Sequence, residues 1–216
     1  IKFLKKIQNH EKIFVLGAGS NTLITDKQFN GVVIKLSNNF NNISLLNNEI
    51  IIAGSAVTDK SLSDFAMEKS LGGFEILSCI PGTVGGGIKM NAGCFEREFK
   101  DILVSIQAID KSGQVITIPA NEISFKYRGS SLSDDLIFLS ASFKGFNKNK
   151  DLIQNEMKIL KEKKEKAQPT RIKTSGSTFK NPINQSDKKV WQLIRDSVPL
   201  EKSFGDASIS EKHYNF

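Results

Sequence analysis

The sequence predicts an α+β fold with three lobes. Its candidate strands fall into two blocks with helices between them, instead of alternating regularly with helices along the chain. The stretch KGFNKN at 144–149 is polar and turn-rich, which is typical of a domain boundary, and a long amphipathic helix follows it. The expected domains are therefore an early lobe at 1–37, a central strand-rich lobe at 38–146 and a helix-led lobe at 147–216.

Apolar spacing and turn residues predict the elements of the first two lobes. Residues 102–110 alternate cleanly between apolar and polar positions, and the turn KSGQ joins them to a second run at 115–118, so we expect a hairpin there. The other elements are a helix at 1–8, strands at 13–16, 32–36 and 136–143, a hairpin of 43–46 with 50–53, and a helix at 61–69.

The third lobe is predicted from one strong helix and weaker signals. Residues 151–167 carry Ile153, Met157 and Leu160 on one stripe, and Pro169 ends the helix. We expect a loop at 170–182, a short helix at 188–196 and a strand or loop at 207–216.

Composition narrows the class of protein. The 30 basic and 23 acidic residues give a net charge of +7, but much of the excess lies in KILKEKKEK, where both signs alternate as on a solvated helix face. A nucleic-acid site typically combines aromatic residues with a continuous basic stripe. Neither is found in this run, so we expect no nucleic-acid partner. No apolar run is long enough to span a membrane, and we expect a cytoplasmic protein with no membrane insertion.

Metal binding is also not expected. Cys79 and Cys94 have no metal-ligand spacing, and the chain has only two histidines. Neither histidine has an acidic partner that can be placed from the sequence, which argues against a Ser-His-Asp hydrolase.

Two glycine-rich runs carry the first functional signal. VLGAGSNTL at 15–23 follows a strand, but its third glycine position falls on Thr22, so it does not match a dinucleotide-binding G-x-G-x-x-G motif. Alone it is an ordinary tight turn. IPGTVGGGIKMNAG at 80–93 has five glycines and no acid, which lets backbone N–H groups approach a phosphate. A bent strand without a ligand is the alternative, and a second acid-free loop in the same domain makes it less favoured.

Five runs together resemble the UDP-N-acetylenolpyruvoylglucosamine reductase family. They occur in the family's order and at similar spacing over nearly the whole chain, and the shorter form of the family is the nearer fit. The runs are VLGAGSNTL, IPGTVGGGIKMNAG, FKYRGSSL, SGSTFKNP and SEKHYNF.

The resemblance implies a three-domain flavoprotein. The first two domains would form a two-domain FAD-binding module of the vanillyl-alcohol-oxidase type, and the third would bind the UDP-sugar substrate. The glycine loops would line the FAD pyrophosphate and ribityl chain. The implied cofactor-binding residues are Gly17, Ala18, Gly19, Ser20, Asn21, Thr22, Pro81, Gly82, Thr83, Val84, Gly85, Gly86, Asn91, Ala92 and Gly93.

The implied reaction passes a hydride from NADPH through FAD to the enolpyruvyl group of the sugar nucleotide in peptidoglycan precursor synthesis. Arg128 matches the family's catalytic arginine, and a guanidinium can grip a carboxylate or enolate by two hydrogen bonds. Ser177 matches the proton-donating serine, a role that requires a site stabilising the alkoxide. Seen alone, the two would be a surface arginine and a turn serine. Implied substrate contacts are Tyr127, Lys180, Asn181, His213 and Asn215.

Some expectations remain open at this point. The family's catalytic glutamate lies beyond SEKHYNF, so no residue here matches it, and we expect a chain truncated at both ends and impaired when it stops at Phe216. SFGDAS and CFERE also depart locally from the family's glycine pattern. Another FAD-dependent oxidoreductase, an alcohol or sugar oxidase, is the alternative, although SGSTFKNP belongs to the reductases' substrate lobe. We infer no obligate protein partner.

Overall fold

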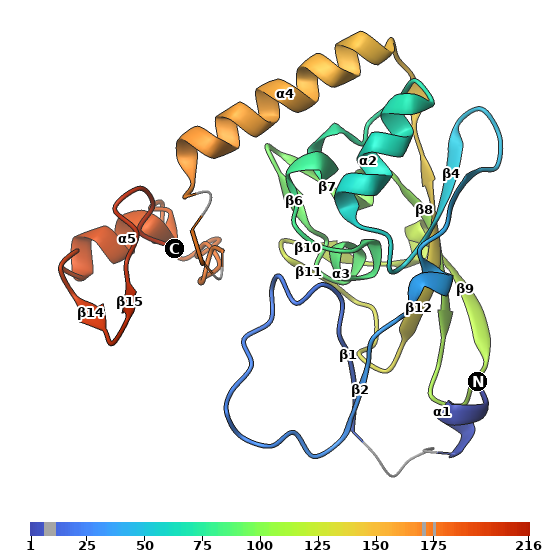
Figure 1. Ribbon diagram of the computed structural model, residues 1–216, viewed down its shortest axis with the longest axis horizontal. Coiled ribbons are helices and arrows are strands. Elements are labelled where there is room, and N and C mark those ends of the chain that lie inside the picture. Colours follow the sequence, from blue (N-terminus) through green and yellow to red (C-terminus); the bar gives the residue numbers. More distant parts are fainter. Residues whose placement is uncertain (7–11, 170–171, 175) are drawn as a thin grey trace. The chain divides into compact units, whose positions relative to one another are not determined.

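The computed structural model describes residues 1–6, 12–169, 172–174 and 176–216 (Figure 1). The chain forms two compact units, which are described separately. Unit 1 comprises Ile1–Gly19 and Thr25–Leu160, and unit 2 comprises Ser20–Ile24 and Lys161–Phe216. The expected boundaries near 37 and 146 stay predictions.

The centre of unit 1 is a five-stranded antiparallel sheet in the order β3-β4-β12-β8-β9. The predicted hairpins are present in it, within one or two residues of the expected ends. Its strands are β3 (Ile43–Leu45), β4 (Ile50–Gly54), β8 (Leu103–Ile109), β9 (Val115–Pro119) and β12 (Ile137–Lys144). Strand β12, whose neighbours are the non-consecutive β4 and β8, joins the two predicted strand blocks into one sheet.

The core of unit 1 lies between this sheet and the helices that cover it. Phe143 of β12 is fully buried, and its ring packs edge-on against Phe74 at 6.3 Å and Phe99 at 6.0 Å between ring centroids. Leu62 and Ala66 of α2 (Asp59–Glu68) are also fully buried. Thr58 is the N-cap of α2, and its side chain accepts a hydrogen bond from the Ser61 N–H.

A short helix, α3 (Val84–Lys89), lies inside the second glycine run and packs against β4 and β12. The glycines of this run predicted a loop or a bent strand and no helix, because glycine has a poor helix propensity. Gly87 shows why glycine is needed, since a Cβ there would lie 2.3 Å from Cε2 of Phe99. Close packing against the core, more than local propensity, therefore accounts for the helix.

A short helix and a pair of short strands precede the main sheet in the sequence. Helix α1 (Lys2–Lys6) is present, and the remainder of the predicted helix at 1–8 lies outside the described residues. Strands β1 (Ile13–Val15) and β2 (Val32–Ile34) form a parallel pair. Leu4, Ile109 and Ile137 form a second, smaller cluster against which Ile13 and Ile34 pack.

Three pairs of two-residue strands complete the described part of unit 1, and none of them is expected from the spacing of apolar residues. They are β5 (Leu71–Gly72) with β13 (Phe146–Asn147), β6 (Gly93–Cys94) with β7 (Arg97–Glu98), and β10 (Phe125–Lys126) with β11 (Gly129–Ser130). The single-turn 3₁₀ helices are η1 (Asn38–Phe40), η2 (Glu75–Cys79), η3 (Phe99–Asp101) and η4 (Ala120–Glu122).

A buried carboxylate attaches β7 to the rest of unit 1. The Glu75 side chain is wholly inaccessible, and it is paired with Arg97 of β7 at 3.1 Å and with Lys148 at 2.8 Å. The Gly73 N–H also donates to it at 2.9 Å. A buried charge needs such partners, because removing it from water without them is costly.

Unit 2 is built from short elements and loops. Helix α4 (Lys150–Ala167) leaves unit 1 after Leu160, and α5 (Val190–Ser197) and the hairpin of β14 (Ser203–Phe204) with β15 (Ala207–Ser208) follow. The predicted helices at 151–167 and 188–196 are thus confirmed within two residues. In the part of unit 2 that the structure describes, Asn215 is the only buried residue.

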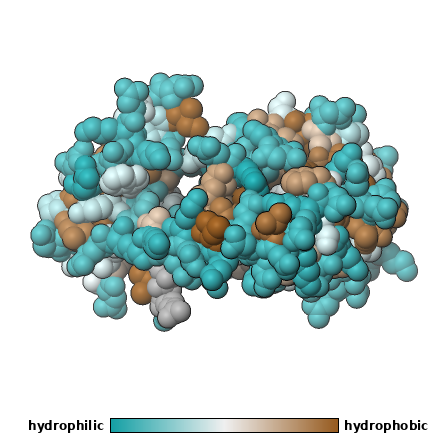
Figure 2. All heavy atoms as spheres, turned by 90° about the horizontal axis from the view of Figure 1, so that it is seen from above, coloured by the Kyte–Doolittle hydropathy of each residue, from teal (hydrophilic) through white to brown (hydrophobic). Residues whose placement is uncertain are grey.

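The molecular face shown in Figure 2 is mostly hydrophilic, with small separate apolar areas. Among the described residues, no helix combines the length and the apolar character needed to cross a bilayer. The same residues contain no group of three or more His, Cys, Asp or Glu side chains that could hold a metal ion.

Candidate functional site

The two glycine runs meet in unit 1. Gly17 lies two residues after the end of β1 at Val15, and a Cβ at Gly17 would lie 2.8 Å from Oγ1 of Thr83. That separation is shorter than a normal contact, so any side chain at residue 17 would force Thr83 to move where the first run approaches the second. The structure therefore brings together two of the sequence-predicted cofactor segments.

The second run is held by backbone hydrogen bonds to the segment between β4 and α2. The Val84 and Gly85 N–H groups donate to the carbonyls of Val57 (2.9 Å) and Ser55 (3.0 Å). Gly86 is exposed, and a Cβ there would meet only Thr83 Oγ1, at 3.7 Å. Together with the absence of acids from 81–86, this open backbone surface fits a phosphate-bearing cofactor such as FAD.

Two residues with buried polar side chains, Ser55 and Asp59, contact this run. The Asp59 N–H donates to the Gly82 carbonyl at 3.2 Å, and Ser55 contacts Gly85. Neither the Asp59 carboxyl nor the Ser55 hydroxyl has a hydrogen-bond partner among the described residues. Burial raises the pKa of Asp59 to about 7, so a neutral carboxyl is favoured below that pH and its repulsion of an anionic ligand is small.

The rest of the first run is more open. Ala18 and Gly19 are exposed, and Gly19 has a φ of +76°, a conformation that glycine adopts without strain. The neighbouring predicted residues Ser20, Asn21 and Thr22 belong to the segment grouped with unit 2, and they are exposed or half-buried.

Asn91, Ala92 and Gly93 join the second run to the β6–β7 hairpin. The Asn91 side chain is fully buried, donates to Glu98 and the Lys126 carbonyl, and accepts from the Lys100 N–H. The side chain of Asn91 is therefore used inside the protein.

Arg128 occupies the turn of the β10–β11 hairpin, next to Tyr127. It has a φ of +55°, which is uncommon for a residue with a side chain, and such conformations cluster at functional sites. Its Nη2 donates to the Gly93 carbonyl at 2.7 Å, and its guanidinium carbon lies 5.1 Å from the centroid of the Tyr127 ring. The predicted catalytic arginine is thus attached to the end of the second glycine run.

Ser177 lies in unit 2 on an exposed loop that Asn215 holds. The Thr178 N–H donates to the Asn215 carbonyl at 3.0 Å. The Asn215 side chain accepts from the Phe179 N–H at 3.0 Å and donates to the Phe179 carbonyl at 2.9 Å. Asn215, implied as a substrate contact, is buried and fastens the segment next to Ser177, while the serine stays accessible.

The remaining predicted residues surround the same loop. Asn181 Oδ1 accepts from the Val190 N–H at 3.1 Å at the start of α5, and Lys180 is exposed. His213 packs edge-on against Phe216, with ring centroids 4.9 Å apart, and its Nδ1 accepts from the Asn215 N–H at 3.2 Å. Burial lowers the pKa of His213, which favours the neutral ring that this hydrogen bond requires.

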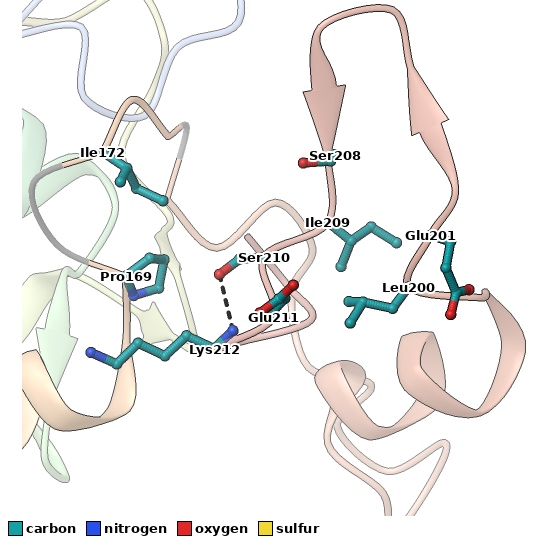
Figure 3. A pocket seen from close by; sticks show the side chains of 9 residues that line it. All are labelled: Pro169, Ile172, Leu200, Glu201, Ser208, Ile209, Ser210, Glu211 and Lys212. Carbon is teal, nitrogen blue, oxygen red and sulfur yellow. Dashed lines mark hydrogen bonds between the residues drawn. The ribbon is translucent and has the colours of Figure 1, made fainter.

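Unit 2 also contains an open hollow of about 720 Å³ (Figure 3). None of the predicted site residues lines it. Its lining residues are Pro169, Ile172, Leu200, Glu201, Ser208, Ile209, Ser210, Glu211 and Lys212. They come from separate loops and a hairpin, so no single run of the sequence indicates the hollow.

Comparisons with known proteins agree with this geometry. The FAD binding domain family matches residues 2–119, and a second family, described as UDP-N-acetylenolpyruvoylglucosamine reductase, C-terminal domain, matches residues 168–216. The first match and the two joined glycine runs place the chain among the FAD-binding α+β proteins, which confirms the predicted fold class and cofactor.

The relatives identify the family more narrowly. The UDP-N-acetylenolpyruvoylglucosamine reductase of Pelagibacter ubique (strain HTCC1062) is 70% identical over 216 residues, which are 100% of this chain and 72% of the relative. That of Rickettsia bellii (strain RML369-C) is 45% identical, over 97% of this chain and 69% of the relative. This chain belongs to the UDP-N-acetylenolpyruvoylglucosamine reductase family.

Solved structures support the same assignment. The enzyme of that name from Thermus caldophilus has a TM-score of 0.86 and 32% identity, covering 100% of this chain and 77% of the other. A carbon monoxide dehydrogenase from Hydrogenophaga pseudoflava, at 12% identity and a TM-score of 0.52 over 67% of this chain, shares the fold alone.

Proposed function

We propose that this protein reduces the enolpyruvyl group of UDP-N-acetylenolpyruvoylglucosamine to give UDP-N-acetylmuramate, with FAD as cofactor and NADPH as hydride source. The observation that carries the proposal is the attachment of Arg128 to the glycine runs, through its 2.7 Å hydrogen bond to Gly93. This bond places a permanent cation beside the segment that fits the cofactor. FAD supplies the hydride chemistry that no side chain can perform.

Arg128 would act on the carboxylate end of the substrate. A guanidinium can form two parallel hydrogen bonds to a carboxylate. As hydride reaches the far alkene carbon, negative charge develops next to this carboxylate, and a fixed cation there stabilises it. Tyr127, beside the guanidinium, would limit the directions in which it can move.

Ser177 would donate the proton to the carbon next to the carboxylate. Its exposed position suits a group that must reach a substrate, and the bonds from Asn215 to Thr178 and Phe179 restrict the loop that carries it. The Ser177 alkoxide left by proton donation needs stabilisation, for which the exposed Lys180 is a candidate. Asn181, His213 and Asn215 would then support the loop more than contact the substrate.

The wider expectations belong to the same proposal. The substrate is a UDP-sugar in peptidoglycan precursor synthesis, and both it and NADPH are cytoplasmic metabolites, so we propose a cytoplasmic enzyme. The mixed charges of 158–166 support the absence of a nucleic-acid partner, because a helix face with interleaved acidic and basic residues lacks a continuous basic stripe. We propose no obligate protein partner.

The test is the anaerobic visible spectrum of the purified protein with FAD. Bands that bleach with NADPH and return when the enolpyruvyl sugar nucleotide is added would support the proposal. Turnover of an alcohol or sugar with oxygen as acceptor would favour the alternative oxidase. Failure to retain any flavin would contradict the assignment of the glycine runs.

A further inference from the structure

Unusual backbone conformations gather around Arg128. Six residues other than glycine have positive φ angles in the described part of the chain, and four of them lie in or next to the β6–β7 and β10–β11 hairpins. These are Asn91 (+41°), Phe95 (+52°), Glu96 (+63°) and Arg128 (+55°). Such strained residues persist only where the surrounding structure holds them, so something must fix these hairpins.

The hairpins cannot supply this rigidity themselves. Each of them consists of two paired residues per strand, and an isolated two-stranded hairpin is marginally stable in water. The turn that carries Arg128 therefore needs hydrogen bonds to the rest of unit 1 to stay in this conformation. One attachment is the bond from its own Nη2 to the Gly93 carbonyl.

The other attachment is the buried side chain of Asn91. Its Nδ2 donates to Glu98 Oε2 at 2.8 Å and to the Lys126 carbonyl at 3.3 Å, and its Oδ1 accepts from the Lys100 N–H at 3.1 Å. Lys126 is the last residue before the Tyr127–Arg128 turn, and Glu98 is paired with Gly93 across the β6–β7 hairpin. Asn91 thus connects both hairpins from a position with no solvent access.

Glu98 adds a charge to this connection. It receives hydrogen bonds from Asn91 and Lys100, the second at 2.8 Å. Partial burial raises the pKa of Glu98, but the hydrogen bonds from Lys100 and Asn91 and the charges of Lys100 and Arg128 lower it overall. The carboxylate is therefore ionised and acts on the Arg128 guanidinium from within the protein.

We propose that Asn91 and Glu98 are positioning residues for Arg128, holding its hairpin and its guanidinium in the orientation that binds the carboxylate of the substrate. This inference rests on the proposed function. It assigns Asn91 a task different from cofactor contact, since its side chain bonds to Glu98, the Lys126 carbonyl and the Lys100 N–H inside the protein.

The test compares the two half-reactions by stopped-flow absorbance of the flavin. Arg128 acts only when substrate reoxidises the flavin, so the ratio of the reoxidation rate to the NADPH reduction rate isolates its contribution. In Glu98→Gln we expect this ratio to fall about ten- to a hundredfold, the usual result of misplacing a catalytic group by about an ångström. The control is Asp64→Asn, which removes an exposed carboxylate paired with Lys60 and should leave the ratio unchanged.

A swapped pair separates positioning from folding. Asn91→Asp combined with Glu98→Gln keeps one side-chain hydrogen bond between the two positions and one negative charge near Arg128. We expect the double variant to recover most of the lost ratio while binding FAD as Glu98→Gln does. The inference would be overturned if the ratio in Glu98→Gln stayed within about twofold of the wild-type ratio. It would also be overturned if both variants lost both half-reactions and bound FAD in parallel. Wild-type protein that substrate cannot reoxidise would instead refute the proposed function, and this inference with it.

Discussion

Different interactions hold units 1 and 2 in their folded structures. Unit 1 surrounds a five-stranded sheet with fully buried apolar side chains such as Phe143, Leu62 and Ile106. In the described part of unit 2, the one buried residue is the polar Asn215, and α5 has no buried side chain. The glycine runs proposed to bind the cofactor lie largely in the densely packed unit 1, whereas the loop that carries Ser177 depends on a few hydrogen bonds. Mutations in the apolar core of unit 1 and mutations of the hydrogen-bonding residues of unit 2 should therefore change stability in different ways.

Phe143→Ala should give the largest loss of stability, because it removes the ring that joins Phe74 and Phe99 in the core of unit 1. We expect a destabilisation of about 3–5 kcal/mol in urea unfolding followed by circular dichroism. Phe204→Ala in unit 2 is the matched control, since that ring is 63% exposed and should cost less than about 0.5 kcal/mol. Equal losses would show that the two units do not differ in this way.

Asp59→Asn should stabilise unit 1 at high pH. Burial raises the folded-state pKa of Asp59 from 3.8 to about 7, so the stability that depends on its protonated form is complete below 3.8 and is lost as pH rises to about 7. The wild type should lose on the order of 2 kcal/mol between pH 5 and pH 8 relative to Asp59→Asn. The measurement is urea unfolding at both values, with Asp64→Asn, an exposed change in the same helix, as control. The same pH dependence in Asp59→Asn would contradict the assignment.

Asn215→Ala should loosen unit 2 locally. It removes both side-chain hydrogen bonds to Phe179, which we expect to cost about 1–2 kcal/mol. Amide hydrogen exchange should then accelerate at Phe179 and not in β12. Exchange that speeds up equally in both regions would mean that Asn215 stabilises more than its own loop.

Acidification should produce the smallest effect, around His213. Because burial lowers its folded-state pKa, the stability linked to His213 is present above its unfolded pKa of about 6.5 and is lost as pH falls through the lower folded value. Solvent screening keeps this well under about 1 kcal/mol. Trp191, the single tryptophan, lies 6.3 Å from His213 between ring centroids and reports the change by fluorescence. A titration that persists in His213→Gln would exclude the histidine as its source.

The same contrast explains what could be predicted from the sequence. The β8–β9 hairpin and α4 follow from alternating or helical apolar spacing, because burial determines where those side chains must lie. Helix α3 could not be predicted, since its glycines are there for close packing against Phe99. The β6–β7 turn uses Phe95 and Glu96 at positive φ, where glycine or asparagine would have signalled a hairpin.

The candidate site shows more clearly which contacts cannot be predicted from the sequence. Motifs identified Arg128 and Ser177, but nothing in the spacing of Asn91 and Glu98 indicates that the two side chains meet beneath the Arg128 hairpin. Likewise, Asn215 fastens a loop 36 residues away in the sequence. Contacts of this kind depend on tertiary structure and leave no periodic pattern in the sequence.

In the proposed reaction, a flavin held by unit 1 needs Ser177 of unit 2 only for reduction of the substrate. The most direct measurement is the anaerobic flavin spectrum of Ser177→Ala, taken with NADPH and then with the enolpyruvyl sugar nucleotide. We predict normal flavin binding and bleaching, followed by reoxidation that is about 10²–10⁴ times slower than in the wild type. Reoxidation at the wild-type rate would contradict the claim.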